Sequence, residues 1–488
     1  MKTTPELIAD IKKAIADGAT EYYIEPGVYY FNGDTPQFNL QNVSYFNVYA
    51  YGVKFMFEPR KKFPSVRLHE CTSVGIYGLT VDFYPLPFAQ GVITSIDKGN
   101  KKLRVTLDAF APVITNEWSA VNGGDTKVIC FNPDGLLHAK NTRLDHVQQV
   151  ANLTEHDVEI TVRGTLYSSP DAELDVGCRV AMPDRSFGHC IQSRYCGNLV
   201  FQDVTVNACS NMAFSESLGN GRNIYRNCRI MRKGSRLLSS NADGFHSSQM
   251  VFGPTIIECR AEFTGDDTVN VHGFTSFVID AGDGPMVFAR SNDYFYAGKK
   301  CIVQRGVKPA FGTDVLTFAR VDDEALRTKY FEAVRTSGMV ENVQSTFDLY
   351  QVATSRLLEH GDFLGSNDEL CMGPRIISNR FTDIYGRGIL MCARSGLIND
   401  NVMQRLGGAG IHVGADLHWS SGPFPHHIKI NRNVIVDAHR LYRLGKQPAS
   451  ITLANIGTGE NSYTKTPLVE LAPDNIVVNP GREAIFIA

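Results

Sequence analysis

Two acidic motifs hold the side chains of this chain that are best suited to acid–base chemistry. The first contains Asp243 with His246 three residues later, and the second contains Asp266 and Asp267 with His272 close behind. Carboxyl groups that are crowded together cannot all ionise at low cost, so at least one pKa should rise. A proton donor beside a carboxylate base is the pair that glycosidic bond cleavage requires. The motifs therefore predict a catalytic cluster of Asp243, Asp266 and Asp267.

Each motif alone has a simpler interpretation. Asp243-Gly244 is typical of a turn, and Gly265-Asp266-Asp267 could form a loop or a calcium site. The catalytic interpretation is favoured over these because Asp243 lies 23 residues before Asp266 and 24 before Asp267. This spacing is one coil of the repeat described next. Residues one coil apart lie on neighbouring strands about 4.8 Å apart.

A weak internal repeat predicts the scaffold that positions these residues. An aliphatic residue is followed three positions later by Asn, Asp or Cys in six places, which are Val200/Asp203, Ile224/Asn227, Ile256/Cys259, Ile376/Asn379, Ile398/Asn401 and Ile430/Asn433. Steps of 22 and 24 residues fit a coil of three short strands, steps of 32 add a longer loop, and the step of 120 adds an inserted domain. The sequence therefore predicts a mostly β protein, a right-handed parallel β-helix, with aliphatic columns inside and Asn ladders at the turns. An ordinary β-sandwich with coincidental spacing is the alternative.

Segments outside the repeat predict additional elements. An N-terminal capping helix should begin with Thr4 as N-cap and end at Gly18, with Leu7 and Ile11 in its apolar stripe. Alternating β segments without the coil pattern predict two inserted small antiparallel β modules. The expected domains are residues 1–90 (cap and first coils), 91–180 (first module), 181–273 (central coils with the acidic cluster), 274–370 (second module) and 371–488 (C-terminal coils).

Composition excludes several classes of protein. The 488 residues are 43% hydrophobic and 20% charged, which suits a large globular core and not a disordered chain. Lys and Arg number 48 and Asp and Glu 51, so the net charge of −3 predicts no nucleic-acid partner. No apolar run is long enough for a membrane span, and no signal-peptide pattern follows Met1. The 11 cysteines are scattered singly, which predicts small buried side chains and no disulfide framework.

The acidic motifs resemble those of two glycosidase families. Asn241-x-Asp243-Gly244 followed one coil later by Gly265-Asp266-Asp267 is similar to family 28, the polygalacturonases. The resemblance is closer to family 110, the exo-acting α-1,3-galactosidases. It includes three further stretches, which are Arg236-Leu-Leu-Ser239, Pro85-Leu-Pro87-Phe88-Ala-Gln90-Gly91 and Asn270-Val-His272-Gly273, and it spans about residues 10–440. Two positions depart from the family 110 pattern, with Tyr84 and Ser421 where acidic residues are expected.

The resemblance implies an inverting glycosidase that needs no metal and no cofactor. Asp266 would be the general acid, and Asp243 and Asp267 would hold and deprotonate the attacking water. The implied activity is exo-acting removal of terminal α-1,3-linked galactose from oligosaccharides or glycans. A β-helix glycosidase acting on another sugar, such as a polygalacturonan, a calcium-dependent polysaccharide lyase and a non-catalytic carbohydrate binder remain alternatives.

Other side chains are candidates for sugar contact. Histidines can orient the carboxylates, arginines can donate hydrogen bonds to hydroxyl groups, and an exposed tryptophan can stack on a pyranose ring. The candidate substrate-binding residues are Glu216, Arg236, His246, Asn270, His272, Arg387, Arg394 and Trp419. The expected partner is a carbohydrate with terminal galactose, and a homodimer is left open. Such a substrate favours a secreted or periplasmic location, although the chain shows no signal peptide.

Overall fold

The computed structural model describes most of the chain. The described residues are 2–33, 37–59, 63–112, 114, 127–139, 143–144, 147–163, 174–290, 299–305, 311–337, 347–353, 358–422, 425–440, 448–456, 463–465 and 469–488. Within them, neither helix has the length and apolar character that a bilayer crossing demands.

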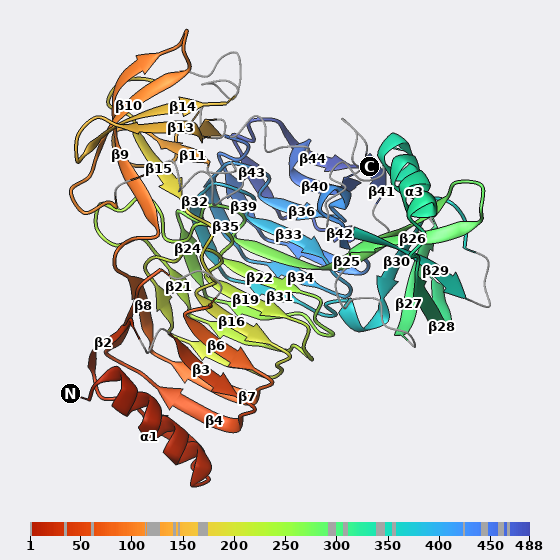
Figure 1. The fold of residues 1–488 in the computed structure, drawn as a ribbon, viewed down its shortest axis with the longest axis horizontal. Coiled ribbons are helices and arrows are strands. Elements are labelled where there is room, and N and C mark those ends of the chain that lie inside the picture. The colour runs from red at the N-terminus through yellow and green to blue at the C-terminus, as the bar shows by residue number, and fades with distance from the viewer. Residues whose placement is uncertain are drawn as a thin grey trace.

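Three long parallel sheets wind the chain into a β-helix (Figure 1). The first sheet (sheet A) contains β1 (Glu21–Tyr23), β4 (Ser44–Tyr49), β7 (Thr72–Tyr77), β17 (Val200–Gln202), β20 (Ile224–Arg226), β23 (Thr255–Ile257), β31 (Arg375–Ile377), β34 (Leu397–Asn399), β38 (Ile428–Asn431) and β42 (Val469–Leu471). The second (sheet B) contains β2 (Gly27–Phe31), β5 (Val53–Phe57), β8 (Thr80–Phe83), β18 (Thr205–Val206), β21 (Arg229–Ile230), β24 (Arg260–Glu262), β32 (Arg380–Ile384), β35 (Val402–Leu406), β39 (Val434–Val436) and β43 (Ile476–Val478). The third (sheet C) contains β3 (Phe38–Gln41), β6 (Val66–His69), β16 (Ile191–Arg194), β19 (Phe214–Ser217), β22 (Phe245–Ser248), β25 (Val269–Asp280), β33 (Ile389–Cys392), β36 (Ile411–Val413), β40 (Ala449–Ile456) and β44 (Glu483–Ile487). The predicted fold class, a right-handed parallel β-helix, is confirmed.

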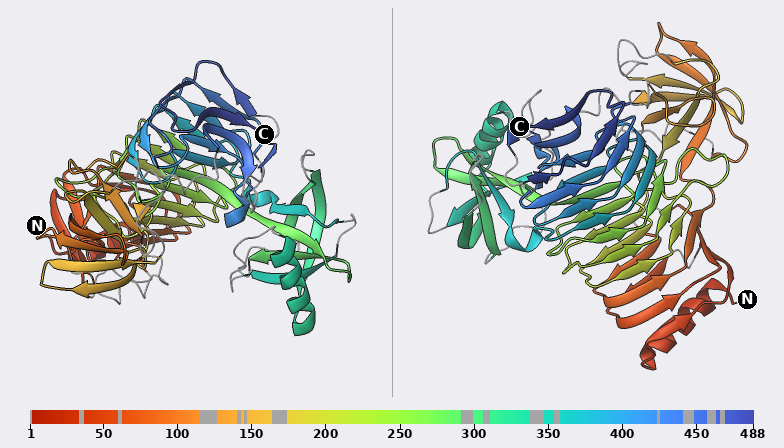
Figure 2. Two further views of the ribbon diagram at one scale, coloured as in Figure 1. Left: turned by 90° about the horizontal axis from the view of Figure 1, so that it is seen from above. Right: turned by 180° about the vertical axis from the view of Figure 1, so that it is seen from behind.

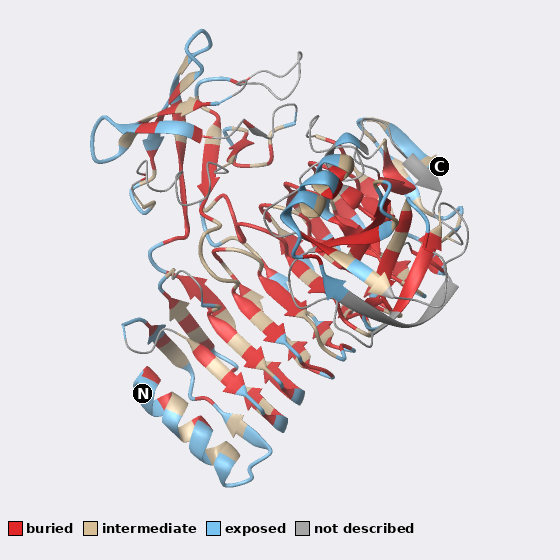
Figure 3. Ribbon diagram, turned by 45° about the vertical axis from the view of Figure 1, so that its right-hand side comes forward, coloured by how far each residue is buried: buried red, intermediate tan, exposed pale blue. Residues whose placement is uncertain are grey.

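The strands of the coils are largely buried (Figure 3), and the side chains that fill the interior of the helix form one apolar core. In sheet A, Ile376, Ile398 and Ile430 are in register and fully buried. The predicted alignment of Ile224 with Ile256 is wrong by one residue, because Ile224 pairs with Thr255. A shift of one residue moves a side chain to the opposite face of a strand, so Tyr225 occupies the interior position in that coil.

Hydrogen-bonded asparagine side chains form a ladder along one row of turns. The Nδ2 group of Asn379 donates to Oδ1 of Asn401 at 2.9 Å, and the same contact at the same length joins Asn401 to Asn433 and Asn433 to Asn475. Each amide also satisfies backbone groups of neighbouring coils, as with the hydrogen bond from Asn401 Nδ2 to Ile376 O. Buried polar groups need such partners, which explains why asparagine recurs at this position.

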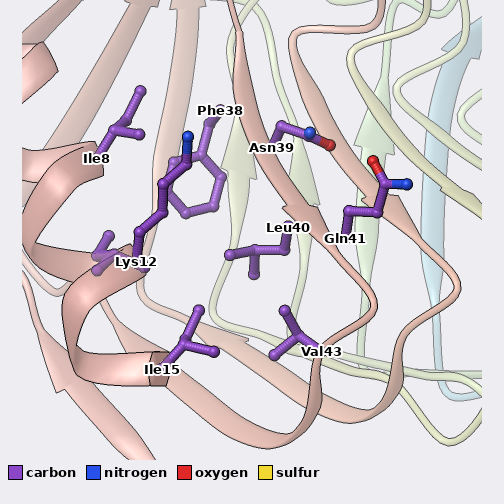
Figure 4. Close-up of a pocket in the computed structure, with 9 residues that line it drawn as sticks. Ile8, Lys12, Ile15, Phe38, Asn39, Leu40, Gln41 and Val43 are labelled. Atoms are coloured by element: carbon purple, nitrogen blue, oxygen red, sulfur yellow. The ribbon is translucent and has the colours of Figure 1, made fainter. Parts of the chain in front are cut away.

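The helix α1 (Thr4–Ala16) covers the N-terminal end of the coils (Figure 1). Its N-cap is Thr3 and not the predicted Thr4, because the Thr3 side chain accepts from Glu6 N and Glu6 in turn accepts from Thr3 N. Leu7 and Ile11 are buried as predicted. A hollow of about 310 Å³ remains between α1 and β3, lined by apolar side chains of both elements together with Lys12, Asn39 and Gln41 (Figure 4).

The first inserted module is a seven-stranded antiparallel sheet that separates β8 from β16. Its strands are β9 (Phe88–Asp97), β10 (Lys102–Leu107), β11 (Val128–Phe131), β12 (Arg143–Leu144), β13 (Val147–Asn152), β14 (Asp157–Val162) and β15 (Arg179–Pro183). It has a hydrophobic core of its own. Because β8 belongs to sheet B and β16 to sheet C, the module leaves the β-helix at the turns that join these two sheets.

The second module separates β25 from β31 and leaves from the other end of the sheet C strands (Figures 1 and 2). The far half of β25 pairs with β26 (Pro285–Arg290) and β30 (Asp362–Ser366), and the module also holds β27 (Lys299–Arg305), β28 (Phe311–Arg320), β29 (Phe347–Ala353), α3 (Glu324–Ser337) and the 3-10 helix η1 (Asn367–Glu369). Two short strands complete the fold, with β37 (Ser421–Gly422) against β25 and β41 (Tyr463–Lys465) against β40. Both predicted modules are therefore present, and their exact boundaries remain predictions.

Candidate active site

The three predicted catalytic carboxylates lie in stacked turns between sheet B and sheet C. Asp243 precedes β22, and Asp266 and Asp267 precede β25 on the next coil. Backbone hydrogen bonds fix this register, since Gly244 N donates to Asp267 O at 2.9 Å and Gly265 N donates to Ser240 O at 2.8 Å. The spacing of one coil inferred from the sequence therefore brings the two acidic motifs side by side.

Two glycines allow the coils to come close at this point. A Cβ on Gly265 would lie 2.6 Å from Asn241 O, and a Cβ on Gly386 would lie 2.6 Å from Asp267 Oδ1. Neither position can hold a side chain without displacing the neighbouring coil. Asp266 and Asp267 lie in the turn before β25. Their side chains therefore need not point to opposite faces, as those of consecutive strand residues do, and both can contribute to the same cluster.

Asp266 is held by two cations near the first module. Arg185 Nη2 lies 2.9 Å from Asp266 Oδ2, and Lys127 Nζ lies 4.0 Å from the same oxygen. Burial acts to raise the pKa of Asp266, but the positive charges of Arg185 and Lys127 outweigh it and lower the pKa to about 2. Asp266 is therefore ionised at neutral pH in the unliganded site.

Asp267 is more deeply buried and is held by Arg387 from the following coil. Arg387 Nη2 lies 2.8 Å from Asp267 Oδ2, and the backbone N of Arg387 donates to Oδ1 at 2.7 Å. Burial, together with the negative charges of Asp266 and Asp243, nevertheless raises the pKa of Asp267 to about 6. Burial is the larger cause of this rise, and the crowding of carboxylates expected from the sequence adds to it.

Asp243 is oriented by two residues of sheet C. Its Oδ2 atom lies 2.7 Å from His246 Nδ1 and 3.3 Å from Asn270 Nδ2. The register of β22 with β25 places His246 beside Asn270 on the outer face of the sheet. His272, two residues further along β25, lies against His246 with an Nε2–Nε2 distance of 3.2 Å. The structure thus brings together three predicted substrate-binding residues, His246, Asn270 and His272, around Asp243.

Two other predicted substrate-binding residues, Glu216 and Arg236, are held in contacts within the protein. Glu216 is 1% exposed and accepts hydrogen bonds from Asn223, Tyr225 and Ser247 inside the β-helix. Burial raises its pKa. Arg236 forms a 2.5 Å ion pair with the fully buried Asp82. The proposed substrate contact of Glu216 is contradicted by this placement, because its carboxylate faces the interior of the coil.

The remaining three predicted residues differ in their relation to the cluster. Arg387 is part of it and also pairs with Asp416 at 3.0 Å. Trp419 follows Asp416 in the 3-10 helix η2 (Leu417–Trp419), and its side chain is half exposed, as a stacking surface for a sugar requires. Arg394 lies at the opposite end of β33, beyond Cys392, where burial lowers its pKa.

Sequence reasoning missed Lys127, Arg185, His189 and Asp416. Lys127 and Arg185 flank β11 and β15 of the first module, and no local motif indicates that they return to the acidic turns. His189 precedes β16, and burial together with the charge of His246 lowers its pKa to about 4. One feature of the sequence could have indicated Asp416, because it lies three residues before the predicted substrate-binding residue Trp419.

Each carboxylate of the cluster faces a basic side chain. Four carboxylates, those of Asp243, Asp266, Asp267 and Asp416, face Lys127, Arg185, Arg387 and the imidazole of His246. Among the described residues, no group of three or more His, Cys, Asp or Glu side chains is arranged to hold a metal ion. A divalent cation at this position would have to displace Arg or Lys side chains that already pair with the carboxylates.

Comparisons with known proteins give distant structural matches only. No family model matches the chain, and no curated protein matches it either. The catalytic domain of a GH87 α-1,3-glucanase is similar over 99% of this chain and 64% of its own, with 10% identity and a TM-score of 0.34. An exopolygalacturonase from Thermotoga maritima is similar over 97% of this chain and 87% of its own, with 11% identity and a TM-score of 0.35. The A-module of the mannuronan C-5 epimerase AlgE4 from Azotobacter vinelandii is similar over 98% and 92%, with 9% identity and a TM-score of 0.29.

These matches leave the family open. The chain spans less than two thirds of the glucanase chain. None of these matches supports membership of family 110.

Proposed function

We propose that the protein is an inverting glycoside hydrolase that removes terminal α-1,3-linked galactose from oligosaccharides or glycans. The observation that carries the proposal is the cluster of Asp243, Asp266 and Asp267 in adjacent turns, where each carboxylate has a different cationic or imidazole partner. Such partners give neighbouring carboxyl groups different proton affinities, which acid–base cleavage of a glycoside requires. The galactose specificity and the exo mode rest on the sequence resemblance to family 110.

The proposed reaction assigns the proton donor to Asp266. Its side chain is 27% exposed, against 7% for Asp243 and 4% for Asp267, so it is the carboxyl group that a sugar can reach most easily. Its described contacts all fall on Oδ2. The proton of Asp266 passes to the leaving glycosidic oxygen while water attacks C1 from the opposite face, and the proton of that water passes to Asp243 or Asp267.

This assignment requires a proton to move when the substrate binds. Between pH 2 and pH 6 the unliganded carboxyl groups of Asp266 and Asp267 hold one proton between them, and it rests on Asp267. A sugar that covers Asp266 removes water from it, and this desolvation favours the protonated form. Asp267 is the rival candidate for the acid, because it holds the proton before the substrate arrives.

The pH dependence of kcat/KM follows from the same two groups. The reactive form carries one proton on Asp266 or Asp267, and that proton is lost as the pH rises through the pKa of about 6. We expect kcat/KM to be highest on the acidic side of pH 6 and to fall about tenfold per pH unit above it. A profile measured from pH 4 to pH 8.5 with terminal α-1,3-galactobiose checks this. A rate that is constant up to pH 8 would contradict the shared proton.

The main alternatives fit the cluster less well. A uronate substrate would need unpaired basic side chains, but Arg232 donates to Gly135 O at 2.8 Å, and Arg236 and Lys233 both face Asp82. The arginines at the acidic turns are already paired with Asp266 and Asp267, which suits a neutral sugar better than a uronate. A calcium-dependent lyase would need carboxylates that are free of cations, whereas Asp266 and Asp267 are paired with arginines.

A substrate comparison tests the proposal. The purified protein is incubated with α-1,3-galactobiose, α-1,4-galactobiose and digalacturonate, each with and without a chelator of divalent cations. We expect release of galactose from the α-1,3-linked disaccharide alone, unchanged by the chelator. Cleavage of digalacturonate would favour the polygalacturonan alternative, and loss of activity with the chelator would favour the lyase. Binding without cleavage, which persists after all three aspartates are changed to Asn, would indicate a carbohydrate binder.

A further inference from the structure

The outward face of sheet C carries two arginines that lie away from the acidic turns. Arg67 on β6 and Arg194 on β16 alternate with the buried residues Leu68 and Ser193, so their side chains point out of the β-helix. The described contacts of the Arg194 guanidinium are with Tyr195, whose hydroxyl group accepts from Nη2 at 3.3 Å and whose ring centroid lies 5.1 Å away. In the part of the chain that the structure describes, neither guanidinium group is paired with a carboxylate.

The ring of His69 lies beside both arginines. His69 follows Arg67 by two residues on β6, and it is in register with Arg194 on β16. Burial and the positive charges of Arg67 and Arg194 lower the pKa of His69, although the charge of Glu70 acts in the opposite direction. Glu70 lies in the turn after β6, with its Oε2 atom 3.8 Å from His69 Nε2. The two arginines therefore make this part of the sheet positive, and Glu70 cancels their charge only in part.

A strip of polar side chains connects the two arginines to the acidic turns. The strands β6, β16, β19 and β22 lie side by side in this order (Figure 1). Their outward positions form two columns, which are Arg67, Gln192, Ser215 and His246, and His69, Arg194, Ser217 and Ser248. We call these two columns the outer strip. Three steps of about 4.8 Å place Arg67 about 14 Å from His246 along the axis of the β-helix.

The same face of sheet C is closed beyond the acidic turns. On the strands that follow β25, the outward positions in the first column are Leu390, His412 and Thr452. Leu390 is 1% exposed, and His412 and Thr452 are fully buried. A glycan whose terminal sugar lies at the acidic turns can therefore continue over the outer strip and not over the later coils. That direction leads to the two arginines.

We propose that Arg67 and Arg194 bind an anionic group, a sulfate ester or a carboxylate, on a sugar of the substrate other than the one that is released. A guanidinium group can donate two parallel hydrogen bonds to such a group. The arginines at the acidic turns are already paired with Asp266 and Asp267, which suits a neutral sugar at the point of cleavage. The substrate class is therefore a glycan with a neutral end and an acidic body. The place of the anion in a cleaved glycan rests on the proposed function, whereas its binding by the two arginines does not.

Titration calorimetry of the full-length protein tests the site with three oligosaccharides of equal length. The first is a galactoside that ends in α-1,3-linked galactose and carries sulfate esters on its other sugars, the second is the same compound after removal of the sulfate, and the third is an oligogalacturonate. All proteins carry Asp266→Asn, which slows cleavage. We expect the sulfated ligand to bind about tenfold or more tightly than the desulfated one. Arg67→Gln combined with Arg194→Gln should remove that difference.

The galacturonate identifies the source of the anion. An affinity for it that depends on the two arginines, with no preference for the sulfated ligand, would support the site and assign it to a carboxylate. The converse result would support the site and assign it to a sulfate ester. Equal affinities with and without the two arginines, for both anionic ligands, would overturn the proposal.

Control variants separate anion binding from a structural effect. Arg226→Gln is the matched control, because Arg226 is an exposed arginine on β20 of sheet A, and it should change none of the affinities. Arg67→Lys combined with Arg194→Lys keeps both charges but not the planar guanidinium groups, so it should keep part of the preference. The protein with both arginines intact gives a test that needs no variant, because its preference for an anionic ligand should weaken as salt is added. A preference that is absent or insensitive to salt would also overturn the proposal.

The activity of the wild type separates this proposal from the proposed function. Arginine-dependent binding of an anionic glycan by a protein that releases no galactose would refute the proposed function and leave the anion site standing. Release of galactose from α-1,3-galactobiose without any arginine-dependent binding of the anionic ligands would do the reverse.

Discussion

Asp266→Asn should lose about a thousandfold in kcat on α-1,3-galactobiose, within the range of 10²–10⁴ that general acid catalysis contributes. The loss should be less than about tenfold on 2,4-dinitrophenyl α-galactoside, because that leaving group departs without protonation. Asp267→Asn should be slow on both substrates, since the activation of water is needed in either case. Initial rates at pH 5.5 with the two substrates check the assignment.

The comparison of the two variants decides which carboxyl group is the acid. If Asp267→Asn retains activity on the activated substrate and Asp266→Asn does not, the proton that rests on Asp267 in the unliganded site is the one used in cleavage. Asp400→Asn is a suitable control, because Asp400 pairs with Arg432 on the protein surface. Its rates should equal those of the wild type on both substrates.

Arg387→Met should destabilise the protein by about 3–5 kcal/mol, the usual cost of removing one partner of a buried ion pair. Arg387 holds both Asp267 at 2.8 Å and Asp416 at 3.0 Å, and the side chains of all three residues are at most 13% exposed. Its loss leaves two buried carboxylates without their shared cation. Urea unfolding at pH 7.5, above the pKa of about 6 of Asp267, measures the effect.

Two further variants show whether charge is the cause. Arg432→Met breaks a surface ion pair with Asp400 and should cost no more than about 1 kcal/mol. Adding Asp267→Asn to Arg387→Met should recover part of the lost stability, because one of the two unpaired charges is removed. Equal destabilisation by Arg387→Met and Arg432→Met would show that the buried pairs contribute little.

The scaffold could be predicted because its signals are periodic and local. Ile376, Ile398 and Ile430 repeat at coil spacing, and the asparagines three residues later form the ladder that the pattern predicts. The wrong step at Ile224 arose because Tyr225 fills an interior position where the pattern expected an aliphatic residue. A repeat defined only by aliphatic residues cannot detect that substitution.

The site could be predicted only in part. The coil spacing placed Asp243 beside Asp267, but Arg185 and Lys127 come from a module whose return to the turns depends on tertiary packing. The error at Glu216 was avoidable, because Glu216 lies two residues after the buried Phe214 on the same strand and therefore shares its inward face.

The stereochemistry of the first product tests the proposed mechanism most directly. Proton NMR follows the anomeric signals of galactose while α-1,3-galactobiose is hydrolysed, before mutarotation mixes them. An inverting cluster of Asp243, Asp266 and Asp267 predicts that β-galactose appears first in the wild type and is released about a thousandfold more slowly by Asp266→Asn. Early α-galactose would contradict the inverting mechanism, and release by Asp266→Asn at the wild-type rate would contradict the proposed acid.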